Sequence, residues 1–174
     1  ARLSATQVDQ AIAAAAGAFP AWAARKAADR GAVLARWAAL VDAHAEALAA
    51  LISLENGKPL AEALGEVRYA NSFITWFAAL APGLNGRAAD SPSGQDLILA
   101  FREPVGPVAA ITPWNFPAAM ITRKVAAAFA AGCVVVLKPA SATPFTALAL
   151  ADLAIEAGVP PEAFSVVTGE QSVV

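Results

Sequence analysis

The sequence has few of the residue types on which disulfide and metal chemistry depend. Its 174 residues include one cysteine, Cys133, and one histidine, His44. A single cysteine cannot form an internal disulfide or supply a cysteine-based zinc site, so these classes are excluded and no metal site is predicted. Because disulfide-free chains are typical of reducing compartments, we expect a cytoplasmic protein.

The sequence also lacks a strong charge of either sign and a long apolar run. Twelve Lys and Arg stand against 14 Asp and Glu, a formal net charge of -2, and no basic run occurs. Neither nucleic acid nor a membrane surface is therefore predicted as a partner. No apolar stretch is long enough to span a bilayer. The alanine-rich segment 11–24 lacks a basic n-region and contains Gly17 and Pro20, so it is predicted as a helix rather than a signal sequence.

The ends of the sequence are unusual. It begins with Ala1 rather than Met and stops at Val174, shortly after an apolar run that is typical of a strand. We therefore expect a piece of a longer protein.

What the sequence has in abundance is apolar material, with 58% hydrophobic residues, enough for a core. Apolar residues recur every three or four positions over 29–52, which predicts one long helix with His44 on its apolar stripe. A histidine in the core or at its rim is favoured there over an acid-base role. Asn56 and Gly57 end this helix, and Pro59 begins another that ends at Pro82.

The second half of the sequence has a pattern of alternating strands and helices. Residues 83–95 have the composition of a surface connection, and 96–102 predict a strand that is apolar on both faces and needs cover. From residue 105 the pattern is βαβαβ, with strands predicted over 108–111, 134–137 and 164–167, and helices over 117–130 and 144–157. Short apolar strands between helices predict a parallel sheet. The fold class is therefore α/β: N-terminal helices followed by a Rossmann-like βαβαβ half domain, with ligands expected at the carboxyl ends of the strands.

The first of these strands leads into a stiff polar turn over residues 112–117. Pro113 and Pro117 fix its backbone, and Asn115 lies between two aromatic residues just before a helix. An amide at that edge can donate to a developing negative charge, as in an oxyanion hole. A purely structural turn, with asparagine chosen to cap the helix, explains the residues equally well.

The second strand ends with another polar group. Lys138 leaves the buried strand at its carboxyl end, Pro139 stiffens the exit, and Ser141 adds a hydroxyl. This group suits an anionic or hydroxyl-rich ligand, although a lysine reaching from a strand end into water is the commoner case. The ligand interpretation gains support because both polar exits are predicted at one edge of one sheet.

Other chemically attractive residues favour structural interpretations. Cys133 begins the second strand, at the end opposite the ligand edge, and is predicted as a buried core thiol. Arg123 could reach a carboxylate, but a solvated helix cation is favoured. Glu66 and Arg68 indicate nothing catalytic. No G-x-G-x-x-G follows the first strand, so the usual dinucleotide fingerprint is absent.

Residues 111–117 and 137–141 together resemble the aldehyde dehydrogenase superfamily. The similarity extends over the whole chain, including residues 55–60, 103–106, 131–133 and 157–169. Residues 117–124 are most similar to the succinate-semialdehyde dehydrogenases of that superfamily. The resemblance implies the N-terminal helical part of a cofactor domain over 1–83, a linker with an oligomerisation-type strand over 84–104, and the first half of an NAD(P)-binding sheet over 105–174.

The resemblance also implies roles for individual residues. Asn115 is expected to be the oxyanion-hole amide that stabilises a thiohemiacetal, and Arg123 to hold the carboxylate of a semialdehyde acid. Lys138 is expected to bind the adenosine ribose or its phosphate. The remaining cofactor-binding residues on this basis are Ile111, Thr112, Pro113 and Trp114 on the nicotinamide side, and Pro139, Ala140 and Ser141 beside Lys138.

The resemblance further implies the cofactor and the partners. Many NAD-preferring members carry Glu where Ser141 stands, so NADP is favoured, with NAD as the alternative. The superfamily's catalytic cysteine and general-base glutamate lie in its second half, so this chain alone is expected to be inactive. A small aldehyde substrate and a homo-oligomer, dimer or tetramer, are expected of the full-length protein. The rival hypothesis is a non-catalytic half domain, acting as an interaction module, or a gene remnant.

Overall fold

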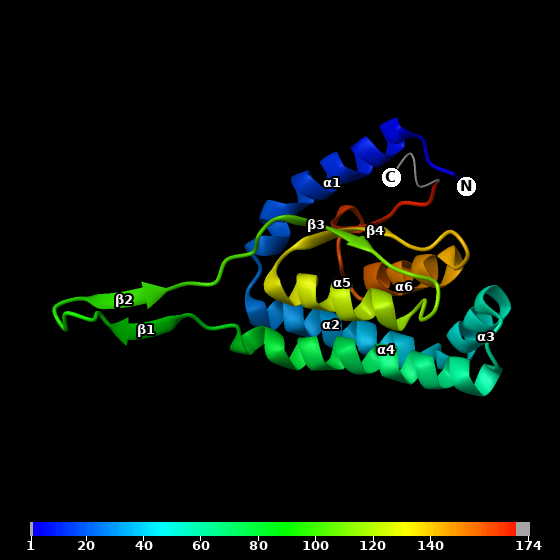
Figure 1. Ribbon diagram of the computed structural model, residues 1–174, viewed down its shortest axis with the longest axis horizontal. Coiled ribbons are helices and arrows are strands. Elements are labelled where there is room, and N and C mark those ends of the chain that lie inside the picture. Colours follow the sequence, from blue (N-terminus) through cyan, green and yellow to red (C-terminus); the bar gives the residue numbers. More distant parts are fainter. Residues whose placement is uncertain (1, 170–174) are drawn as a thin grey trace.

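The structure, a computed structural model, describes residues 2–169. Helices form the first half and alternate with strands in the second (Figure 1). In chain order the elements are α1 (Ala5–Ala23), α2 (Ala27–Ala43), α3 (Ala45–Asn56), α4 (Leu60–Leu80), η1 (Ala81–Gly83), β1 (Arg87–Asp90), β2 (Leu97–Ala100), β3 (Pro107–Ile111), α5 (Ala119–Ala131), β4 (Val134–Lys138), α6 (Pro144–Glu156), η2 (Pro161–Ala163) and β5 (Phe164–Val166).

The strands β3, β4 and β5 form a parallel sheet in that order, with Val135 of β4 paired to Val108 of β3 and to Phe164 of β5. Helix α1 covers one face, and α5 and α6 cover the other (Figure 1). Helices α2 and α4 pack on the far side of α5. The central strand β4 is buried along nearly its whole length, because helices lie on both of its faces. The predicted α/β fold, with N-terminal helices before a Rossmann-like βαβαβ part, is confirmed.

Four aromatic side chains hold these layers together. The ring of Phe129 on α5 makes edge contacts with Trp22, Trp37 and Phe164, at centroid distances of 5.6, 6.4 and 5.4 Å. Both indole N–H groups are satisfied, since Trp22 donates to the Phe129 carbonyl at 3.3 Å and Trp37 to the Leu150 carbonyl at 3.1 Å. This cluster joins α1, α2 and the sheet through α5.

The prediction of one long helix over 29–52 is wrong. The chain breaks at His44 into α2 and α3, whose axes differ by 71°, and His44 is exposed rather than in the core. The bend lets Val41 before it and Leu48 after it both become buried, so the apolar spacing continues across a break that neither glycine nor proline marks. The predicted helix end is confirmed, with Gly57 in the left-handed region at φ 82°.

Within residues 2–169, no single helix is long and apolar enough to cross a membrane. Only the bent pair α2 and α3, taken together, meets that test of length and composition.

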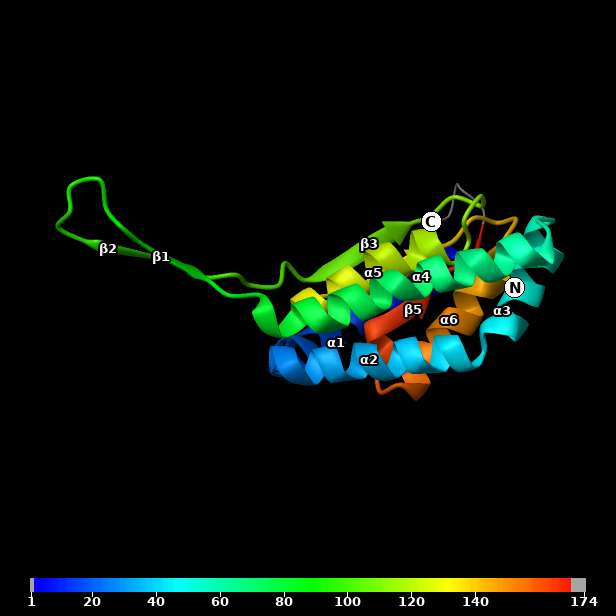
Figure 2. The ribbon, with the colours of Figure 1, turned by 90° about the horizontal axis from the view of Figure 1, so that it is seen from below.

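Strands β1 and β2 form an antiparallel hairpin that projects far from the rest of the molecule (Figures 1 and 2). The predicted strand over 96–102 is present as β2, but 83–95 is not merely a connection, since Arg87–Asp90 forms β1. Strand β1 lacks the alternation of large apolar residues that indicates a strand, and it forms because β2 supplies its hydrogen-bond partners. Within the described part of the chain, the apolar side chains of β2 stay exposed.

Candidate functional site

The exits of β3 and β4 meet at one edge of the sheet, as the sequence predicts. Ile111 pairs with Lys138 in the parallel register, and the Thr112 amide donates to the Lys138 carbonyl at 3.1 Å. The polar turn after β3 and the polar group after β4 are thus neighbours, although 26 positions separate Thr112 from Lys138 in the sequence.

The turn after β3 presents its side chains to the outside. Thr112 is buried, whereas Pro113, Trp114, Asn115 and Phe116 are exposed. Asn115 does not cap α5, because the helix N-cap is Ala118. The capping role considered for this asparagine is therefore not realised, and its side chain is exposed at the ligand edge.

The group that does cap α5 is Glu66 of α4, which the sequence analysis dismissed. Its carboxylate accepts hydrogen bonds from the amides of Ala118 at 2.8 Å and Ala119 at 3.4 Å, and its residue is only 4% exposed. Glu66 lies on the inner face of α4, between the buried residues Ala63 and Ala70, which stand three positions before it and four after it.

Lys58 pairs with this buried glutamate. Its ammonium contacts the Glu66 carboxylate, donates to the backbone carbonyl of Asn115 at 3.1 Å and lies 4.6 Å from the centroid of the Phe116 ring. Lys58 is therefore a contact of the turn that carries Asn115.

The N-terminus of α6 is capped in the same way from a distance. The carboxylate of Glu55 accepts from the amides of Phe145 at 2.8 Å and Thr146 at 2.9 Å, and from the Thr146 hydroxyl. Both crossover helices thus direct their positive ends at carboxylates of this chain. The N-termini of α5 and α6 are therefore occupied by these carboxylates. The sequence accordingly lacks the glycine fingerprint that would place a pyrophosphate at the N-terminus of α5.

The exit of β4 lines a hollow of about 210 Å³. Lys138 donates to the Pro139 carbonyl at 2.9 Å, and the Ser141 hydroxyl lies 3.5 Å from the Gly169 carbonyl. All four predicted residues of this exit line the hollow; the others, which the sequence analysis did not identify, are Arg2, Pro144, Thr168 and Gly169. Ile111 and Lys138 also line an adjacent apolar hollow of about 250 Å³, together with Val8 and Ile12 of α1.

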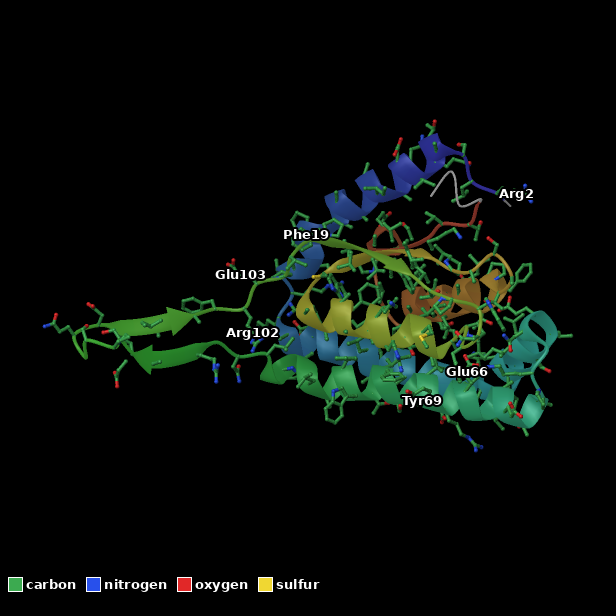
Figure 3. All side chains as sticks on the ribbon, in the orientation of Figure 1. Arg2, Phe19, Glu66, Tyr69, Arg102 and Glu103 are labelled. Atoms are coloured by element: carbon green, nitrogen blue, oxygen red, sulfur yellow. The ribbon has the colours of Figure 1, made fainter. Side chains whose placement is uncertain are left out.

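Arg123 is not the solvated helix cation that its sequence position favours. It is half-buried on α5 and donates to the Tyr69 hydroxyl at 2.9 Å, with its guanidinium carbon 4.8 Å from the centroid of the Phe73 ring. Its Nε is buried and has no hydrogen-bond partner in the part of the chain that the structure describes. Both aromatic residues come from α4, the helix that also supplies Glu66, and Figure 3 labels Tyr69 and Glu66 there.

Cys133 lies at the opposite end of β4 and is buried, as predicted. Near it, the guanidinium of Arg30 donates to the Ala130 and Ala23 carbonyls at 3.1 and 3.3 Å, and burial lowers the pKa of Arg30. This end of the sheet is therefore a packed structural region. Within residues 2–169, no cluster of three or more His, Cys, Asp or Glu side chains could hold a metal ion.

A comparison with protein families decides the affiliation. The sequence profile described as "Aldehyde dehydrogenase family" matches residues 1–174, the whole chain. The chain belongs to the aldehyde dehydrogenase family.

Relatives of this aldehyde dehydrogenase chain are much longer than it is. It is 51% identical over 173 residues to the NADP(+) succinate-semialdehyde dehydrogenase of Escherichia coli, covering 99% of this chain and 36% of that protein. It is 50% identical over 168 residues to a glutarate-semialdehyde dehydrogenase of Pseudomonas aeruginosa, covering 97% of this chain and 35% of that protein. The chain thus spans about a third of the length of these relatives.

Solved structures of aldehyde dehydrogenases have the same fold over this region. The crystal structure of a succinate-semialdehyde dehydrogenase from Burkholderia pseudomallei aligns with a TM-score of 0.96 at 49% identity, covering 99% of this chain and 36% of that one. An E. coli NADP-dependent enzyme aligns with a TM-score of 0.96 at 51% identity, covering 99% and 36%. The resemblance stated from the sequence is confirmed at the level of family and fold, while the roles of individual residues stay predictions.

Proposed function

We propose that the chain forms the N-terminal part of an NADP-dependent dehydrogenase that oxidises succinate semialdehyde to the acid. The observation that carries the proposal is the meeting of two polar strand exits at one sheet edge, joined by the bond between Thr112 and Lys138. One exit presents an exposed amide and the other a cation beside a hollow. These are the groups that a reacting carbonyl and a phosphorylated ribose need.

The residues of the second exit suit the adenosine end of NADP. The Lys138 ammonium supplies a positive charge, and the Ser141 hydroxyl can donate to a phosphate oxygen or a ribose hydroxyl. No acidic side chain lines that hollow within the described residues, so nothing there opposes a 2′-phosphate. The apolar hollow borders both Lys138 and Ile111. Ile111, Thr112, Pro113 and Trp114 are proposed to line the nicotinamide side of the site. When bound, the nicotinamide supplies the hydride acceptor.

Asn115 is proposed as the donor to the aldehyde oxygen. Its side chain is exposed and is not used to cap α5. An amide that donates to an oxygen gaining negative charge stabilises the transition state more than the ground state. The rigid turn around it keeps this donor in place.

Arg123 is proposed to hold the carboxylate at the far end of the substrate. Tyr69 and Phe73 fix its guanidinium, and its Nε has no hydrogen-bond partner among residues 2–169. Guanidinium groups suit carboxylates in charge and geometry. The named relatives act on aldehydes with an acidic group, such as succinate and glutarate semialdehydes, which supports an acidic aldehyde as the substrate here.

The nucleophile and the general base are proposed to come from residues that these 174 do not include. Cys133 is unsuited as a nucleophile because it is buried at the end of β4 opposite the proposed site. The isolated chain is therefore proposed to be inactive and the full-length protein to be a cytoplasmic homo-oligomer, dimer or tetramer. The rival proposal is a non-catalytic half domain or interaction module.

The test starts from the natural protein that carries this sequence. Its intact mass is measured, followed by oxidation of succinate semialdehyde with NADP and with NAD. We expect a mass well above that of 174 residues and faster turnover with NADP. A mass equal to that of the 174 residues, with neither turnover nor NADPH binding, would favour the non-catalytic alternative.

A further inference from the structure

The turn that ends α3 is itself rigidly built. Gly57 adopts its left-handed conformation there, its amide donates to the Ser53 carbonyl at 3.0 Å, and the Ser53 hydroxyl donates to the Lys58 carbonyl at 2.8 Å. Two hydrogen bonds therefore fix the turn from within. The side chains of Glu55, Asn56 and Lys58 leave this fixed base.

These three side chains reach both loops of the ligand edge. Glu55 binds the N-terminus of α6, which follows the exit of β4. Asn56 and Lys58 bind the turn that follows β3: the Asn56 amide donates to the Trp114 carbonyl at 2.9 Å, and Lys58 donates to the Asn115 carbonyl at 3.1 Å. One short turn thus contacts both exits, although it belongs to neither.

The contacts of Asn56 and Lys58 have a particular geometric consequence for Asn115. The Trp114 carbonyl belongs to the peptide plane before the Asn115 α-carbon, and the Asn115 carbonyl belongs to the plane after it. Because both planes are held, both backbone dihedrals of Asn115 are fixed. These dihedrals set the direction in which its side chain leaves the backbone.

Lys58 is in turn held by the interior of the protein. Its side chain is 13% exposed and that of its partner Glu66 only 1%. Glu66 also binds the first amides of α5, which begins directly after the turn. A buried ion pair with further hydrogen bonds on the carboxylate is directional and costly to break. The ammonium is therefore a fixed donor to the Asn115 carbonyl.

We infer that Asn56 and Lys58 are positioning residues that set the direction of the Asn115 amide. The inference rests on the proposed role of Asn115 as donor to the substrate oxygen. Neither residue touches the substrate or the cofactor in this scheme, and both act only through the backbone of the turn. Their loss therefore lowers the turnover number, while the binding of nucleotide at Lys138 is unchanged.

The sharpest variant is Asn56→Asp in the natural protein. It keeps the shape of the side chain, replaces the donor by a carboxylate facing the Trp114 carbonyl, and leaves the ion pair between Lys58 and Glu66 intact. We expect kcat to fall by about 10- to 100-fold, the range that a misdirected donor produces, with the Kd of NADPH changed less than about twofold. Lys58→Met with Glu66→Gln removes both charges together and should lower kcat similarly. Lys124→Met, on the exposed face of α5, is the matched control and should leave kcat unchanged.

Combination with Asn115→Ala separates positioning from a general structural role. If Asn56 acts through the Asn115 amide, Asn56→Asp has almost no further effect on kcat once that amide is gone. The inference is overturned if Asn56→Asp keeps full kcat, or if its effect persists undiminished in the Asn115→Ala background. If Asn115→Ala alone retains full activity, the proposed function of Asn115 fails as well, and this result is distinct from the other two.

Discussion

The phenol of Tyr69 accepts a hydrogen bond from the guanidinium of Arg123 at 2.9 Å, and this contact ties α4 to α5. Phe73, one turn further along α4, lies beneath the same guanidinium and makes an edge contact with the Tyr69 ring at 4.8 Å. An arginine held on two sides loses little further side-chain entropy when it binds a ligand. The pair of Arg123 and Tyr69 is therefore suited to recognising a carboxylate.

Replacement of Arg123 should lower kcat/KM for an acidic aldehyde but not for a neutral one. In Arg123→Gln we expect kcat/KM for succinate semialdehyde to fall about 10- to 100-fold, because a hydrogen bond to a charged group contributes about 1.5–3 kcal/mol. The value for butanal, which lacks the carboxylate, should change little. Tyr69→Phe should have a smaller effect in the same direction. Equal losses for both aldehydes would contradict a role in substrate recognition and indicate a packing role.

Replacement of Ser141 should change the preference between the two nucleotides. Ser141→Glu places a negative charge in the hollow beside Lys138, so we expect the Kd of NADPH, measured by fluorescence titration, to rise about 10- to 100-fold by charge repulsion. The Kd of NADH should stay within about threefold. Ser141→Gln, of similar size but uncharged, is the control for steric effects. If the glutamate weakened both nucleotides equally, the hollow would not be the site of the 2′-phosphate.

The arrangement of the ligand edge could be predicted because it follows from a general rule of parallel sheets. Once 108–111 and 134–137 are recognised as neighbouring strands, Asn115 and Lys138 must emerge on the same side. Local apolar runs and flanking prolines carry all the information that this step needs. The end of α3 and the beginning of α6 were predictable for the same reason. Gly57 ends the one helix and Pro144 begins the other through their own backbone preferences.

The parts that could not be predicted depend on contacts between distant positions. The bend at His44 arises from packing against α4, and no local residue marks it. The caps supplied by Glu55 and Glu66 act across 90 and 52 positions, which hydrophobic periodicity cannot reveal. The local sequence favoured a solvated Arg123 because its partners, Tyr69 and Phe73, lie on another helix.

The stability of the fold should depend strongly on Phe129. Its side chain is fully buried among Trp22, Trp37 and Phe164, so Phe129→Ala should lower the free energy of unfolding by about 3–5 kcal/mol through lost burial and a residual cavity. Urea denaturation followed by circular dichroism measures this change. Phe101→Ala is the matched control, since Phe101 is 78% exposed and its loss should cost less than about 0.5 kcal/mol. Similar losses for the two variants would contradict the central position of Phe129.

The projecting hairpin should be needed for association rather than for folding. Leu97, Ile98 and Leu99 of β2 are all exposed, and a two-stranded hairpin is only marginally stable by itself in water. A contact with a second copy of the protein would bury these side chains and supply hydrogen-bond partners to the strand edge.

In the natural protein with Leu97→Ser and Leu99→Ser, sedimentation velocity should therefore show smaller assemblies, with the free energy of unfolding of the monomer nearly unchanged. Leu54→Ser is the control, because Leu54 is 84% exposed on α3, at the other end of the molecule in Figure 1. Assemblies of unchanged size in the hairpin variant would mean that copies of the protein meet elsewhere.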